Sequence, residues 1–191
     1  MAATHPNTTE SYEKLLVANL QRTLDFLKFA EAKNAAMLAL ASGWFFAIIN
    51  VETNGKNVPA GLTVGMTLAL PLALFAGVLA MLSFLPRLHL PGFLGGRRAG
   101  PHPKNLLYFG DISTLPIKTL ERDLRDRYFS PSTLHTDDYI HDLIVQISVN
   151  SEITLRKMRL FKLGMWLIVA AGIALLIPIL QLAIKGFANL W

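Results

Sequence analysis

The sequence predicts an all-α membrane protein with three transmembrane helices, the first and third extended into cytoplasmic amphipathic helices. The chain has 191 residues, of which 52% are hydrophobic and only 16% charged, a composition too apolar for an ordinary soluble domain. Three stretches, 35–51, 60–85 and 164–184, approach the ~20 apolar residues that cross a bilayer, although the first is short. Residues with apolar side chains at helical spacing precede the first and third stretches.

The positive charges predict the orientation of the three spans. Sixteen of the eighteen Lys and Arg residues lie in two segments, 1–34 and 86–163. Cytoplasmic segments carry such an excess, so we expect a cytoplasmic N-terminus and a periplasmic C-terminus. Segment 1–34 is then a cytoplasmic helix, and 86–163 holds a cytoplasmic loop and helices. We interpret the formal net charge of +5 as this orientation signal and expect no nucleic-acid binding.

The N-terminal helix carries a leucine stripe. Leu16, Leu20, Leu24 and Leu27 recur at helical intervals, and no breaker separates them from Ala35. This helix should therefore enter the membrane directly. Its stripe can be buried against the corresponding C-terminal helix of the same chain or against a second subunit, and the pattern leaves both open.

The C-terminal helix repeats this plan. Its polar half has apolar residues at Ile140, Leu143, Ile144 and Ile147, and a basic collar at 156–162 leads into the span 164–184. A polar stripe, Gln146, Asn150 and Lys157, follows the same helix. Such a stripe is either a solvated face or the wall of a small-molecule pocket.

Both of the first two spans contain ladders of small residues, which let helix backbones approach closely inside lipid. The neighbouring helix could belong to the same chain or to another subunit. Pro71 and Pro178 predict a static kink or a hinge. Asn54-Gly55 in the external connection suits a tight turn with positive φ. The ladders are Ala35, Ala39, Gly43 and Ala47 in the first span, and Gly61, Gly65, Ala69, Ala73 and Gly77 in the second.

An aromatic and apolar run, Asn105 to Ile112, lies in the segment between the second and third spans. We expect a buried turn or extended segment there, because such a run in a cytoplasmic loop has little reason to be apolar unless it packs onto something. Ser113 or Thr114 should then cap a short helix that starts at Pro116.

Motifs for catalysis and metal binding are mostly missing from the sequence. His135, Asp137, Asp138, His141 and Asp142 are close together, but they form no paired-histidine motif, and we expect no metal site. We find no nucleophile elbow, dinucleotide fingerprint or kinase signature, so we expect no catalytic residues and no enzyme. The spans carry no charged residue, which argues against an ion-coupled transporter.

The sequence resembles the transmembrane effectors of Pycsar antiphage defence. The resemblance rests on the run 105–112, on Asp142 with Gln146, and on Asn150-Ser151-Glu152-Ile153 followed by Lys157 and a span. It also includes Lys33-Asn34 before the first span. It covers roughly residues 16–176.

The resemblance implies an inner-membrane effector activated by cyclic CMP or cyclic UMP, which a neighbouring cyclase makes, and which impairs the membrane of the infected cell. The chain has too few residues outside its long helices for a conventional cyclic-nucleotide-binding β-roll, so the ligand would bind among the cytoplasmic helices, between subunits of a homo-oligomer. The hypothetical ligand contacts are Asn105, Tyr108, Phe109, Asp111, Gln146, Asn150 and Lys157, with Arg97 and Arg98 as further phosphate partners. The alternatives are a constitutive structural subunit of a membrane complex and a small oligomeric channel, neither of which senses a nucleotide.

Overall fold

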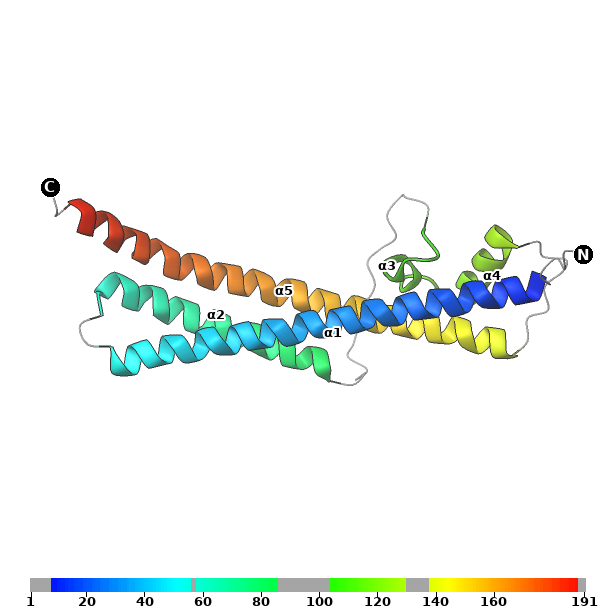
Figure 1. The fold of residues 1–191 in the computed structure, drawn as a ribbon, viewed down its shortest axis with the longest axis horizontal. Coiled ribbons are helices and arrows are strands. Elements are labelled where there is room, and N and C mark those ends of the chain that lie inside the picture. The colour runs from blue at the N-terminus through cyan, green and yellow to red at the C-terminus, as the bar shows by residue number, and fades with distance from the viewer. Residues whose placement is uncertain (1–7, 56–57, 86–103, 130–137, 189–191) are drawn as a thin grey trace, which may run out of the picture. The chain divides into compact units, whose positions relative to one another are not determined.

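The computed structural model describes residues 8–55, 58–85, 104–129 and 138–188, and these are helical with no strand (Figure 1). Three of the helices are long and apolar enough to cross a membrane, which confirms the predicted fold class. Arg97, Arg98, His135 and Asp137 lie outside the described residues. The helices are α1 (Thr8–Asn54), α2 (Ala60–Phe84), α3 (Phe109–Ile112), α4 (Ile117–Tyr128) and α5 (Asp138–Ala188).

The chain forms two compact units. One, which we call the polar unit, comprises Met1–Ala30 and Arg87–Lys157, and the other, the apolar unit, comprises Glu31–Pro86 and Met158–Trp191. Helices α1 and α5 each run without a break from the first unit into the second. The divisions at Ala30 and Lys157 fall among the basic residues that the sequence places before each span.

The core of the polar unit joins segments that are far apart in the sequence. Parts of α1 and α5 lie side by side (Figure 1), and the turn before α3 and helix α4 pack against them. The amphipathic stripes of the N- and C-terminal helices therefore meet within one chain. The core residues are Tyr12, Leu16, Leu106, Ile112, Leu115, Leu120, Leu124, Ile140, Leu143, Ile144 and Ile147.

The predicted leucine stripe of α1 is only partly correct. Leu16 is fully buried, but Leu20, Leu24 and Leu27 are half-buried, and the residues that accompany Leu16 in the interior are Tyr12, Asn19 and Thr23. The buried residues follow intervals of four, three and four. This alternation keeps a row aligned along a neighbouring helix, whereas a strict interval of four drifts around the helix surface.

The small-residue ladder of α2 packs within the same chain. A Cβ atom at Gly65 would lie 2.6 Å from the Ala174 carbonyl oxygen and 2.9 Å from Pro178 Cγ, so only glycine permits this approach of α2 to α5. Ala69 and Ala73 on the same ladder are fully buried. Pro178 is buried inside the continuous helix α5, where its ring contributes to this packing.

The ladder of α1 has the opposite environment. Ala35, Ala39, Gly43 and Ala47 are all exposed, and among the described residues nothing lies within 4 Å of a Cβ atom built on Gly43. Similar patterns thus serve different purposes, because the α2 ladder packs inside the chain and the α1 ladder is bare.

Two local predictions are wrong. The φ angle of Gly55 is outside the left-handed region, and this residue is instead required by space, because a Cβ would clash with the Val51 carbonyl oxygen. Helix α4 begins after Pro116 with no side-chain cap. Ser113 and Thr114 instead donate their hydroxyls to the carbonyl oxygens of Gly110 and Asp111, at 3.0 and 2.7 Å, and so close helix α3.

Candidate ligand-binding site

The turn before α3 is held together by its own polar side chains. The Asn105 Oδ1 atom accepts a hydrogen bond from the Leu107 amide at 2.9 Å, and Asp111 Oδ2 accepts one from the Asn105 amide at 3.0 Å. Asparagine and aspartate commonly form such local bonds to nearby backbone amides. Two of the predicted ligand contacts therefore shape the turn.

Two further hydrogen bonds attach this turn to neighbouring helices of the polar unit. Asn19 of α1 donates from Nδ2 to the Leu106 carbonyl oxygen at 3.2 Å, and both residues are 1% exposed. Arg127 of α4 donates from Nη1 to the Lys104 carbonyl oxygen at 2.8 Å. The turn is thus fixed to α1 on its buried side and to α4 nearer the surface.

Three aromatic rings form a row along the turn. The ring centroids of Phe26 and Phe109 are 5.0 Å apart, and those of Phe109 and Tyr108 are 4.7 Å apart. Phe109 is buried, whereas Tyr108 is 43% exposed. The Tyr108 ring occupies the space where a side chain at Gly110 would lie, which explains the glycine after the two aromatic residues. Tyr108 therefore presents a supported ring on which a planar base could stack.

The predicted polar stripe lies along α5. Gln146 is exposed, and Asn150 and Lys157 are half-buried. Asn150 donates from Nδ2 to the Gln146 carbonyl oxygen of its own helix at 2.9 Å. The turn residues and this stripe belong to separate sets of contacts, since the turn is bonded to α1 and α4 and Asn150 to its own helix.

His141, which the sequence suggested as a possible metal ligand, pairs with helix α4. Its Nδ1 atom lies 3.4 Å from Glu121 Oε2, a contact that joins α5 to α4. Among the described residues no group of three His, Cys, Asp or Glu residues is placed to hold a metal ion.

A family model for the Pycsar effector protein domain matches residues 15–184, most of the chain. The chain belongs to the Pycsar effector family. It is 35% identical over 166 residues to the Pycsar effector protein RsPycTM of a Rhizobium species, an alignment that covers 85% of this chain and 92% of the relative. No solved structure matches the chain.

The family match confirms the resemblance inferred from the short motifs. The matched residues include parts of both the polar and the apolar unit and all three candidate spans. This Pycsar effector is therefore an antiphage transmembrane protein whose polar unit belongs to the family as much as its spans do.

The interior of the polar unit also contains polar residues that the sequence analysis did not single out as buried. We call them the polar layer: Asn19, Thr23, Ser148, Ser151 and Thr154, each at most 2% exposed. Asn19 Oδ1 and Ser151 Oγ have no hydrogen-bond partner among the described residues. An unsatisfied buried polar group costs about 1–3 kcal/mol. The signal that could have found the polar layer is its spacing, because its residues continue the buried rows of α1 and α5.

Tyr12 is a further buried polar group of the effector. Its pKa is raised to about 12, mainly because burial disfavours the charged form and also because the Glu121 carboxylate repels it, while Arg125 acts in the opposite direction. The hydroxyl has no hydrogen-bond partner among the described residues. Its ring makes an edge contact with Phe129, with the centroids 5.0 Å apart.

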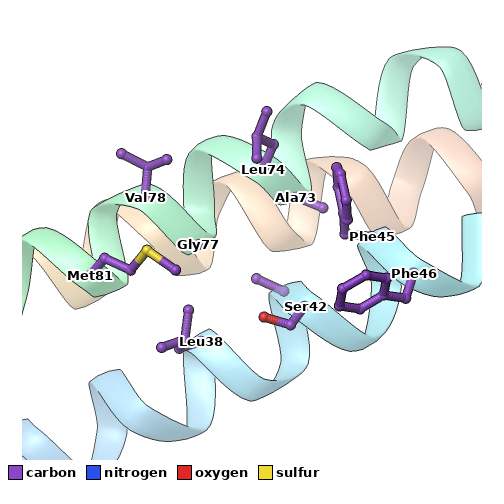
Figure 2. A pocket seen from close by; sticks show the side chains of 10 residues that line it. Leu38, Ser42, Phe45, Phe46, Ala73, Leu74, Gly77, Val78 and Met81 are labelled. Atoms are coloured by element: carbon purple, nitrogen blue, oxygen red, sulfur yellow. The ribbon is translucent and has the colours of Figure 1, made fainter. Parts of the chain in front are cut away.

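The apolar unit contains a hollow of about 210 Å³ between α1 and α2 (Figure 2). Leu38, Phe45 and Phe46 line it from α1, and Leu74 and Met81 from α2. Apart from the Ser42 hydroxyl its lining side chains are apolar, so it lacks the charged and polar groups that a nucleotide requires. The groups suited to a nucleotide lie in the polar unit.

Proposed function

We propose that this effector is an inner-membrane protein that responds to cyclic CMP or cyclic UMP, made by a neighbouring cyclase, and impairs the membrane of an infected cell. Its N-terminus is cytoplasmic and its C-terminus periplasmic. The observation that carries the proposal is the family match over residues 15–184, which includes a folded polar unit as well as the spans. One chain then supplies both the part that senses and the part that acts on the bilayer.

The nucleotide binds to the polar unit. Tyr108 stacks the pyrimidine, because its exposed ring is backed by Phe109. Asn105 and Asp111 hold the turn that presents this ring, and their remaining oxygens face the ligand.

On α5, Gln146 and Asn150 read the base edge and Lys157 binds the cyclic phosphate, to which Arg97 and Arg98 also contribute. The α5 stripe and the turn make separate contacts within the chain. We therefore place the complete site between the turn of one subunit and α5 of another.

The effector acts as a homo-oligomer. The exposed ladder of α1 supports this, because small residues along one face allow close helix packing in lipid and nothing within the described chain covers Gly43. A ligand shifts the oligomer only if it binds one arrangement better than the other. A site shared by two subunits satisfies this condition.

Isothermal titration of the full-length protein in nanodiscs with cyclic CMP and cyclic UMP tests direct sensing. Loss of a base-stacking ring costs about 1–3 kcal/mol, so Tyr108→Ala should weaken binding by about 5- to 150-fold. Tyr139→Ala is the matched control, since Tyr139 is also an exposed tyrosine of the polar unit. A wild-type protein that binds neither nucleotide would contradict the proposal.

Dye uptake by cells separates the proposed effector from a constitutive structural subunit or an open channel. The effector should admit dye only when a cyclase or added nucleotide is present. Uptake that is independent of nucleotide would favour a channel, and no uptake under any condition would favour a structural subunit.

A further inference from the structure

The contact between α1 and α5 changes character along the polar unit. Near their N-terminal ends the two helices pack through Tyr12 and Leu16 on one side and Ile140, Ile144 and Ile147 on the other. Further along, the same spacing brings Asn19 and Thr23 of α1 and Ser148, Ser151 and Thr154 of α5 into the interior. An apolar layer is thus followed by the polar layer.

The polar layer adds few bonds between the two helices. Thr23 Oγ1 donates to the Asn19 carbonyl oxygen at 2.9 Å, and Thr154 Oγ1 donates to the Asn150 carbonyl oxygen at 2.8 Å, so each hydroxyl bonds to its own helix. The Ser151 hydroxyl has no partner among the described residues. The polar layer therefore contributes less hydrophobic burial than the apolar layer, without side-chain bonds to compensate.

Asn19 also cannot satisfy its free oxygen by turning its side chain. Its Nδ2 atom donates to the Leu106 carbonyl oxygen, and a flipped amide would place Oδ1 against that carbonyl, an acceptor against an acceptor. Asn19 Oδ1 therefore remains buried without a donor among the described residues. Separation of the helices would let water reach it, which lowers the cost of opening at this level.

The polar layer is connected to the candidate site. The Asn19 side chain holds the Leu106 carbonyl, and Leu106 precedes Tyr108 in the same turn. A ligand that moves this turn would act directly on the polar layer.

We propose that the polar layer is the point at which α1 and α5 separate or repack when the effector is activated. This inference rests on the proposed function, because it requires a ligand that acts on the turn. The resting arrangement is held by the apolar layer and weakened at the polar layer, so a ligand needs to supply only a limited bias to change it.

Ser151→Ala tests the proposal, because it removes the unsatisfied hydroxyl with little change in volume. Ser83→Ala is the matched control: Ser83 Oγ is also buried without a partner among the described residues, but it lies on α2 in the apolar unit. The first measurement is amide hydrogen exchange of the full-length protein in nanodiscs without nucleotide. Exchange at residues 17–24 and 147–155 should slow by about tenfold in Ser151→Ala and stay unchanged in Ser83→Ala.

The second measurement is nucleotide-triggered dye release from proteoliposomes. Half-maximal release by Ser151→Ala should require about tenfold more cyclic CMP or cyclic UMP than the wild type, and the Ser83→Ala threshold should not change. Equal exchange in the wild type and Ser151→Ala, or equal threshold shifts in the two variants, would overturn the proposal. A wild type that releases no dye with either nucleotide contradicts the proposed function instead, and hydrogen exchange then decides on the polar layer alone.

Discussion

Replacement of Tyr12 by phenylalanine should stabilise the polar unit. The Tyr12 side chain is 2% exposed and its hydroxyl has no hydrogen-bond partner among the described residues, so folding removes this group from water without compensation. Phenylalanine retains the ring and its edge contact with Phe129. We expect Tyr12→Phe to raise the free energy of unfolding by about 1–3 kcal/mol at pH 7.

The same substitution should remove a pH dependence. The pKa of Tyr12 rises from 10.0 to about 12 on folding. The unfolded chain therefore loses this proton first as the pH rises. The neutral hydroxyl favours the folded state fully below pH 10, and this contribution is lost between about pH 10 and 12. A shift of this size corresponds to roughly 2–3 kcal/mol of stability lost over that range. Tyr12→Phe should show no such loss at this position.

Urea titration followed by far-ultraviolet circular dichroism, in micelles between about pH 7 and 11.5, measures both effects. The three tryptophans, Trp44, Trp166 and Trp191, all belong to the apolar unit, so tryptophan fluorescence would report on the wrong part of the chain. Tyr139→Phe is the control, since Tyr139 is 52% exposed. A Tyr12→Phe protein that is less stable than the wild type at pH 7, or equally sensitive to alkali, would refute the reasoning.

Three further predictions follow from the glycines. Gly65→Val should lower the melting temperature in detergent, because its side chain meets the Ala174 carbonyl, whereas Gly43→Val should leave the melting temperature unchanged, because no described residue lies near it; equal effects would contradict the different roles of the two ladders. The same Gly43→Val change should reduce cross-linking between copies in membranes by about tenfold, since a branched side chain prevents close helix approach, and undiminished cross-linking would place the subunit interface elsewhere. Gly110→Ala should displace the Tyr108 ring and weaken nucleotide binding by a factor similar to Tyr108→Ala, and unchanged titration would contradict the role of that ring.

The fold could be predicted largely from the sequence because its strongest signals are long. Uninterrupted apolar stretches identified the spans, and the lack of a breaker between Leu27 and Ala35 indicated that α1 continues into the second of its two environments. The division of the small-residue ladders could not be predicted, since Gly43 and Gly65 occur in similar patterns. Only the position of α5 distinguishes them.

The candidate site was harder to predict. The sequence pointed to the run 105–112 because an apolar segment in a polar region must pack, but it could not indicate that Asn105 and Asp111 bond to the turn itself. Asn19 escaped notice because the predicted stripe followed leucines at intervals of four. A polar residue in a buried row is recognised only when the partner helix is known.

The core of the polar unit has a consequence for how the protein is made. Tyr12 and Leu16 pack with Ile140 and Ile144, so the first helix to leave the ribosome has to wait for the last one before its apolar face is covered. Two spans must be inserted in the meantime. The early part of α1 therefore spends most of synthesis as an uncovered amphipathic helix beside the membrane surface, and closing of the polar unit signals that the last helix has been made.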